Sequence, residues 1–200
     1  NKSIQEIGRW PWPRKIHSAF LRQLNFYNPR TVALDINFAE AENLESDTEL
    51  AKAIKEAKFP LVLPIEILSF KNSKTLLLPL KYFREFENVL LGYVNVPDSV
   101  DGSARNFPTG LDINGQTLWP FASQVASSVG VKNSVSGWID FVGPAGSFIT
   151  YSLSDFLDGK ISQDKIRDKI ILVGATASDL HDLVTAPLKQ NLISGIEWHA

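Results

Sequence analysis

Several polar side chains stand at the ends of apolar runs in this sequence, or just beyond them. In an open sheet of parallel strands, ligands bind outside the carboxyl ends of the strands. If the apolar runs are neighbouring strands, these polar side chains meet at one rim of the sheet. The sequence therefore predicts a ligand-binding site made of Asp35, Asn37, Glu66, Thr176, Asp182 and Thr185. An alternative stays open for Asp35 and Asp182, because aspartate also fixes loops by accepting backbone N–H bonds.

The segment "SDLHDLVT" offers a different chemistry through Asp179, His181 and Asp182. Imidazole and carboxylate groups are ligands for several divalent metals. Together with Asp35 they would make a secreted metal-dependent hydrolase, which is the alternative function. The same residue types are also common turn formers, and the other two histidines lie far away in the sequence. We therefore predict no metal ion at these residues. The sequence also contains no G-x-S-x-G, P-loop, G-x-G-x-x-G or H-E-x-x-H motif, so we predict no cofactor and no catalytic residue.

The composition is typical of a folded globular protein. The chain has 200 residues, of which 44% are hydrophobic and 21% charged, and its net charge of -2 gives no reason to expect a nucleic-acid partner. Cysteine is absent, which excludes disulfides and thiolate chemistry. No apolar run approaches the roughly 18 residues typical of a transmembrane helix. Because the chain starts at Asn1 and contains no methionine, we expect it to be part of a longer protein.

The elements that must position these residues alternate between helices and strands. Apolar residues at helical spacing predict helices over 13–28, 46–57, 121–129 and 152–159. Apolar runs predict strands over 31–38, 59–67, 88–96, 137–144 and 167–177. This order predicts one α/β domain over 1–200, with a mixed, mainly parallel sheet and crossover helices.

Local signals refine this scheme. Asn114 and Gly115 form a turn signal, which predicts one β-hairpin insertion between 104 and 121. Ser46 and Glu49 have the spacing of a capping box, which would begin the second helix. Pro64 places its strand at a sheet edge or ends the strand early. Residues 70–75, "FKNSKT", are typical of a loop.

The stretch "RWPWPR", residues 9–14, stands immediately before the first predicted helix. Its prolines give the chain a stiff entry into that helix, because Pro13 suits the first helical position. We expect the rings of Trp10 and Trp12 to pack over the start of the helix. The alternative is that these rings form a ligand platform or an anchor at a membrane interface.

Six segments of the chain, in order, resemble a known family. They are "WPWPR", "VALDINF", "DTELAKAI", "LLGYVNVPDSVDGSAR", "KIILVGATASDLHDLVTAPL" and "SGIEWHA". Together they are similar to the extracytoplasmic sensor domains of the second CHASE class (cyclase/histidine kinase-associated sensory extracellular). The resemblance extends from Trp10 to Ala200. The positions that carry the family's pattern are Trp10, Pro11, Trp12, Arg14, Asp35, Phe38, Asp47, Leu50, Ala51, Asp101, Gly102, Arg105, Gly174, Ala175, Asp182, Pro187, Gly195, Glu197 and His199.

The resemblance implies the input domain of a bacterial transmembrane receptor. Such a domain lies outside the membrane after an N-terminal transmembrane helix, and further transmembrane helices lead to a cytoplasmic kinase or cyclase. It implies no catalytic activity and brings no established ligand. The expected partners are therefore an unknown small molecule and the flanking transmembrane helices, and a second copy of the chain in a homodimer is a further candidate. A dimerisation module without a ligand is the third functional interpretation.

Overall fold

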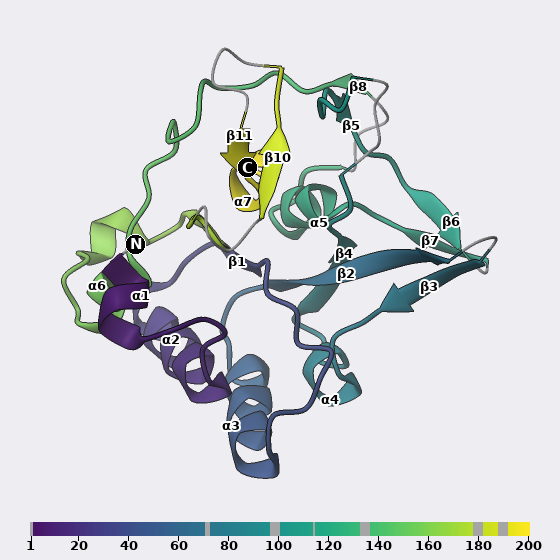
Figure 1. Ribbon diagram of the computed structural model, residues 1–200. Coiled ribbons are helices and arrows are strands. Elements are labelled where there is room, and N and C mark those ends of the chain that lie inside the picture. Colours follow the sequence, from purple (N-terminus) through teal and green to yellow (C-terminus); the bar gives the residue numbers. More distant parts are fainter. Residues whose placement is uncertain are drawn as a thin grey trace.

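A mixed five-stranded sheet forms the centre of the computed structural model, which describes residues 2–70, 73–96, 101–113, 115–132, 137–177, 182–187 and 192–200 (Figure 1). Its strands are β1 (Thr31–Leu34), β2 (Leu61–Phe70), β3 (Ser73–Leu77), β4 (Val89–Tyr93) and β9 (Ile170–Val173). β1 pairs in parallel with β9 and β2, and β2 pairs in parallel with β4, whereas β3 runs antiparallel to β2. The predicted α/β class with a mixed sheet is confirmed.

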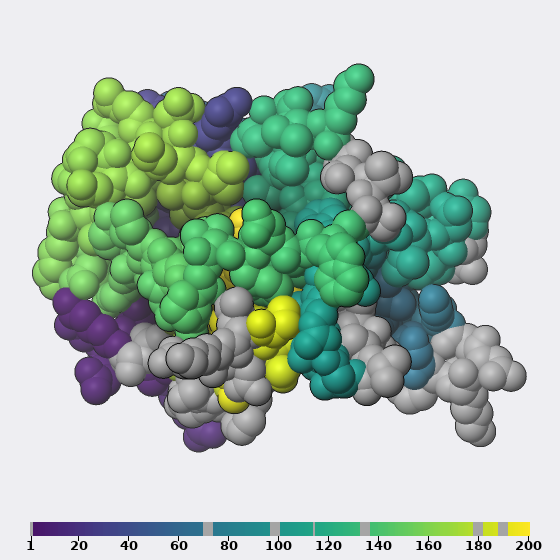
Figure 2. All heavy atoms as spheres, turned by 90° about the horizontal axis from the view of Figure 1, so that it is seen from above, coloured from purple at the N-terminus to yellow at the C-terminus, as the bar shows by residue number. Residues whose placement is uncertain are grey.

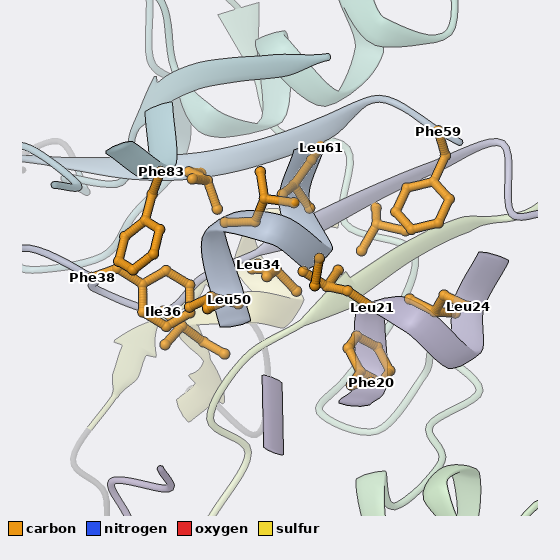
Figure 3. Packing of buried hydrophobic residues seen from close by; sticks show 14 of the residues in the cluster. Phe20, Leu21, Leu24, Leu34, Ile36, Phe38, Leu50, Phe59, Leu61 and Phe83 are labelled. Carbon is orange, nitrogen blue, oxygen red and sulfur yellow. The ribbon is translucent and has the colours of Figure 1, made fainter. Parts of the chain in front are cut away.

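Helices cover both faces of this sheet. The lower face in Figure 1 carries α2 (Arg14–Tyr27), α3 (Leu44–Lys55) and α4 (Lys81–Arg84), and the upper face carries α5 (Phe121–Ser128) and α7 (Gly195–Trp198). Side chains of β1 alternate between the two layers, since successive residues of a strand point to opposite faces. Val32 and Leu34 belong to the hydrophobic cluster between the sheet and the helices α2 and α3, shown in Figure 3. Ala33 packs on the opposite face with Phe121 and Ile196.

The remaining elements are short and lie outside the central sheet. In the described residues three further antiparallel strand pairs stand apart from the central sheet, so antiparallel pairing exceeds the single predicted insertion. They join β5 (Asn106–Phe107) to β8 (Gly137–Trp138), β6 (Leu111–Ile113) to β7 (Gln116–Leu118), and β10 (Leu183–Thr185) to β11 (Leu192–Ser194). The helical pieces are α1 (Lys2–Ile7), α6 (Leu153–Leu157) and a 3-10 turn (Gln163–Lys165). Asn114, in the predicted turn of β6 and β7, lies outside the described residues.

The start of α3 differs from its prediction. The helix begins at Leu44, and the Asn43 side chain caps it by accepting a hydrogen bond of 2.9 Å from the Ser46 N–H. Ser46 is therefore inside the first turn, so the predicted capping box of Ser46 and Glu49 is wrong. Asparagine and serine both make good caps, and the extended backbone of Asn43 decides between them.

The predictions around Pro64 and residues 70–75 are also wrong. β2 continues through Pro64 to Phe70 and lies between β1 and β4, because both pair with Leu61 and Val62. Proline has no N–H to donate, and Pro64 is tolerated because its nitrogen faces away from β4. The hydrogen bonds on the β4 side are made instead by the Leu61 N–H, which donates to the Asn88 carbonyl, and by the Ile65 carbonyl, which accepts from the Val94 N–H. It also lies between Val62, the last residue paired with β1, and Glu66, the first paired with β3. Of the segment expected to be a loop, Phe70 belongs to β2 and residues 73–75 belong to β3, which pair with each other, while residues 71 and 72 lie outside the described residues.

The predicted packing of the tryptophans over the start of α2 is confirmed for Trp10. Its half-buried ring packs against the main core and meets the ring of Trp12 edge to face, with 5.1 Å between the centroids. The Trp12 indole N–H donates a hydrogen bond of 2.8 Å to the Gly8 carbonyl. "RWPWPR" thus fixes the end of α1 to the start of α2.

The arginine that ends this stretch reaches a buried carboxylate on α3. The Arg14 Nε lies 3.5 Å from Asp47 Oδ1, and the two side chains are only 13% and 6% exposed. The Arg14 guanidinium also lies over the Phe38 ring, 4.6 Å from its centroid. On the other side of the carboxylate, Asp47 Oδ2 accepts hydrogen bonds from the Tyr82 hydroxyl and the Glu42 N–H. This buried ion pair therefore joins α2, α3 and the segment before α3.

Candidate functional site

Asp35 and Asp182 come together at the carboxyl end of β1. Asp35 follows the last residue of β1, and its N–H donates to the Val173 carbonyl at 2.7 Å, which fixes its backbone beside β9. Both carboxyl groups are half-buried. Burial, with a smaller contribution from the Asp182 charge, raises the pKa of Asp35 to about 7. Burial also raises the pKa of Asp182.

The carboxyl of Asp182 is held against the start of α7. The Gly195 N–H donates to the Asp182 carbonyl at 3.0 Å, and a methyl group on Gly195 would overlap the Asp182 carboxyl. Nearby, a methyl group on Gly174 would lie 2.8 Å from the Ile196 Cβ. Two glycines thus let α7 approach both the carboxyl pair and the end of β9. Within the described residues, the Asp35 side chain has no hydrogen bond.

The other four predicted site residues differ from one another in burial and in what they contact. Thr185 is half-buried on β10, and Thr176 is exposed after β9. Asn37 is exposed, and its amide oxygen accepts from the Ala39 N–H at 2.8 Å, as in a turn-forming asparagine. Glu66 is half-buried on β2 and pairs in register with Leu77 of β3. Asp35 and Asp182 are therefore the pair with a direct interaction.

The hydrolase alternative receives no support from the described part of the chain. Asp179 and His181 lie outside the described residues. Among the residues that are described, no three histidine, aspartate or glutamate side chains gather in a way that could hold a metal ion.

A cavity of about 490 Å³ lies on the upper face of the sheet, and sequence reasoning missed it. Its walls are α5, β8, β9, α7 and residues 139–151, which join β8 to α6 and which we call the strap. Figure 2 shows the strap in green, crossing the molecule above the yellow C-terminal residues. None of the six predicted site residues lines this cavity.

The C-terminal side of the cavity is formed by residues of the motif "SGIEWHA". Glu197, Trp198 and His199 all line it. His199 is buried against the rings of Trp198 and Phe121, at centroid distances of 4.9 and 5.2 Å. Burial lowers the pKa of His199 to about 4, so the imidazole is neutral at physiological pH. The clustering of aromatic and titratable residues in "EWHA" was the one signal for this cavity in the sequence.

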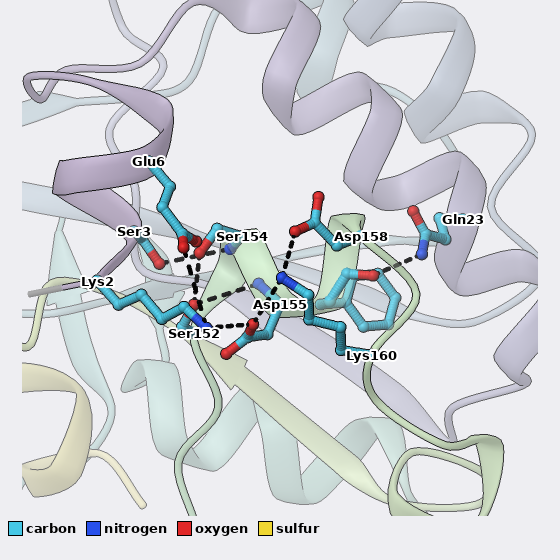
Figure 4. Close-up of polar contacts among 10 residues, drawn as sticks. Lys2, Ser3, Glu6, Gln23, Ser152, Ser154, Asp155, Asp158 and Lys160 are labelled. Carbon is cyan, nitrogen blue, oxygen red and sulfur yellow. Dashed lines mark hydrogen bonds and ion pairs between the residues drawn. The ribbon is translucent and has the colours of Figure 1, made fainter.

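The strap leads directly to a polar contact between α6 and the first helix of the chain. The Lys2 ammonium lies 2.5 Å from Asp155 Oδ1, and the Ser154 N–H donates to the Ser3 hydroxyl at 3.5 Å (Figure 4). On the other side of α6, the Gln23 amide of α2 donates to the Phe156 carbonyl at 2.6 Å. α6 is thus held between the strap, α1 and α2.

Comparison with models of known protein families shows the family of this chain. The family model described as "CHASE2 domain" matches residues 1–200. The chain belongs to the CHASE2 family. CHASE2 domains are extracellular sensory domains rather than catalytic ones, so the predicted resemblance is confirmed, and family membership supports a sensory role outside the cytoplasm. No curated protein and no solved structure matches the chain.

Several pattern positions of this CHASE2 domain gather at two places in the structure. Trp10, Arg14, Phe38 and Asp47 meet around the start of α2. Gly174 and Asp182 contact α7, and α7 contains Gly195 and lines the cavity through Glu197. No helix in the described ranges combines the length and apolar character that a membrane span requires.

Proposed function

We propose that this CHASE2 domain is the input domain of a transmembrane receptor, and that a small polar ligand binds at Asp35 and Asp182. In this proposal the flanking transmembrane helices relay the response to a cytoplasmic kinase or cyclase. Family membership supports the sensory part of the proposal. A ligand shifts such a receptor only if it binds the two signalling states with different affinity.

The observation that carries the proposal is the arrangement of the two carboxyl groups. They interact electrostatically, they are half-buried, and no side-chain hydrogen bond holds Asp35 within the described residues. A ligand that brings a positive charge or hydrogen-bond donors would stabilise both carboxylates. Thr185 and Thr176 extend the proposed site, because they stand on the segments that follow Asp182 and Gly174.

A route for the signal is offered by α7. Its first residue, Gly195, touches the Asp182 carboxyl, so a ligand that repositions Asp182 also repositions the start of α7. Near the other end of α7, the Glu197 carboxylate accepts from the Gly146 N–H of the strap at 2.8 Å. The strap continues into α6, which is bound to α1. The proposed output is therefore a movement of α1 relative to the sheet.

Thermal unfolding of the domain in a panel of amino acids, sugars, organic acids and polyamines tests the site. A genuine ligand should raise the melting temperature of the wild type but not that of Asp35→Asn or Asp182→Asn. Asp112→Asn is the matched control, because Asp112 is exposed on β6 and, within the described residues, its side chain bonds only to nearby Thr117. A ligand that stabilises Asp35→Asn as well as wild type would remove Asp35 from the site.

Receptor output is the second measurement. A ligand found in this way should change the kinase or cyclase activity of the full-length receptor when it is added on the extracytoplasmic side. Binding to the domain without any change in output would contradict the proposed relay.

A further inference from the structure

The cavity beneath the strap has the size and lining of a small-molecule site. Its volume of about 490 Å³ lies within the range of roughly 300–1,000 Å³ that is common for ligand pockets. Aromatic rings come from two sides, with Trp138, Phe141 and Phe148 from β8 and the strap and Trp198 from α7. The floor is apolar, since Ile170 and Leu172 of β9 contribute to it.

The charged side chains among the described residues that line this cavity have one sign. They are Asp140 and Glu197, and no lysine or arginine is found in that described lining. His199 adds no positive charge, because burial lowers its pKa to about 4. A carboxylate or phosphate ligand would therefore meet only negative charge from the described residues of the lining.

The two carboxylates differ in what they already bind. Glu197 accepts from the Gly146 N–H at 2.8 Å and from the Ser194 hydroxyl at 3.4 Å. Asp140 is exposed at the cavity and has no hydrogen bond or ion pair within the described part of the chain. Asp140 is thus the carboxylate that remains available to a ligand, while Glu197 holds the strap in place.

We propose that this cavity binds an organic ammonium ion, with the ammonium group at Asp140 and the apolar body against the aromatic rings. Cations are attracted to the faces of tryptophan and phenylalanine within about 6 Å, and the attraction is strongest for tryptophan. Trp138 suits this role, because its ring is 77% exposed on a strand that borders the cavity. The biological meaning of this site rests on the proposed sensory function, but the binding itself does not.

Titration calorimetry with three compounds of similar shape tests the inference: 2-phenylethylammonium, 2-phenylethanol and 3-phenylpropanoate. The ammonium ion should bind about tenfold more tightly than the alcohol, as expected from one charge-assisted and one cation–π contact. The propanoate should bind most weakly. Equal affinity for the ammonium ion and the alcohol, or no ammonium binding at millimolar concentration, would overturn the proposal.

Variants then locate the binding. Asp140→Asn and Trp138→Ala should each weaken ammonium binding about tenfold, by removal of the charge or of the ring. Their matched controls are Asp164→Asn and Phe26→Ala, which alter an exposed aspartate and a 78% exposed ring outside the cavity. Both control variants should bind like the wild type. Unchanged affinity in Asp140→Asn, with a wild-type melting temperature, would contradict the assignment.

Two measurements distinguish failure of the cavity proposal from failure of the proposed function. Asp35→Asn should leave ammonium binding unchanged, because Asp35 does not line the cavity. Ammonium binding that leaves the output of the full-length receptor unchanged would uphold the cavity site and reject its sensory role. Loss of ammonium binding in Asp35→Asn would show that the two sites are one and would overturn this inference.

Discussion

The two faces of the central sheet are built differently. On the face covered by α2 and α3, the side chains of Leu21, Leu34, Leu50 and Phe83 are completely buried, and the polar Arg14 and Asp47 neutralise each other. On the face covered by α5 and α7, a cavity separates the sheet from the strap, and two carboxyl groups of like charge lie together. Close packing stabilises the first face, whereas the second face holds the cavity and the carboxyl pair on which both proposed binding sites depend.

The contrast also shows in how apolar side chains are used. Phe38 is fully buried between α2 and α4, whereas Trp138, Val142 and Ile149 expose more than three quarters of their surface on β8 and the strap. Exposed apolar side chains that gather on one segment commonly mark a binding surface. The following predictions test the contrast, from the largest expected effect to the smallest.

Replacing one aromatic residue on each face gives the largest difference. Phe38→Ala should lower the free energy of unfolding by about 3–5 kcal/mol, since it leaves a void in a packed core. Trp138→Ala should change it by less than about 0.5 kcal/mol, because the ring is mostly exposed. Urea denaturation of both variants measures these values. A costly Trp138→Ala would show that the upper face is also a packed core.

Breaking the buried ion pair should be nearly as damaging. Arg14→Ala or Asp47→Ala leaves an unpaired charge in a buried site, with an expected loss of about 3–5 kcal/mol. The double variant Arg14→Met with Asp47→Leu should lose less than the sum of the two single losses. The exposed pair Lys52 and Glu56, 4.0 Å apart on α3, is the control, and each alanine there should cost at most about 0.5 kcal/mol. Additive losses at Arg14 and Asp47 would mean that the two side chains do not act as a pair.

The like-charge pair should make the domain less stable as pH rises. Burial raises the pKa of Asp35 from 3.8 to about 7, so the native state binds this proton more tightly than the unfolded chain does. The free energy of unfolding should therefore fall between pH 3.8 and pH 7. The upper limit of that fall is about 4 kcal/mol, at about 1.4 kcal/mol per pH unit.

Two buried histidines act in the opposite sense and must be separated from this effect. Burial lowers the pKa of His17 and His199 from 6.5 to about 4, so their contribution makes the domain more stable as pH rises through that range. The comparison of wild type with Asp35→Asn cancels the histidines. Asp35→Asn should gain stability relative to wild type as pH rises. A constant difference between the two proteins would show that Asp35 titrates normally.

The smallest effect is expected where α6 contacts α1. Asp155→Asn removes the carboxylate that binds the Lys2 ammonium, whose hydrogen bond lowers the pKa of Asp155. Because this contact is exposed, the melting temperature should stay close to that of the wild type. Amide hydrogen exchange should become faster over α1 and stay unchanged over β1. Unchanged exchange over α1 would show that Lys2 does not hold the helix.

Local patterns made part of this fold predictable. The apolar spacing of Ile16, Phe20 and Leu24 determined α2, and the run at 170–173 determined β9, because each element buries one continuous set of side chains. β3 was not predictable in the same way, since its residues Ser73–Leu77 start with polar side chains. Its register depends on the extension of β2 beyond Pro64, which is a property of the assembled sheet.

The candidate site, like the fold, could be predicted from the sequence only in part. The proximity of Asp35 and Asp182 followed from the assumption that polar residues meet at strand ends, and the structure places these two together. Asn37 and Glu66 met the same criterion in the sequence, but a turn and a strand pairing occupy their surroundings. The cavity could not be predicted, because its walls come from segments between 107 and 200 that become neighbours only after folding.

The contact of Lys2 with Asp155 has a mechanical consequence. Tension applied at the start of α1 is shared between the backbone, which leads into α2, and this contact, which leads into α6. The first path ends in a close-packed core with little compliance. The second reaches the strap, which has no regular secondary structure and is fixed to α7 by the bond between Gly146 and Glu197. A displacement of α1 should therefore deform the strap before it strains any strand of the sheet.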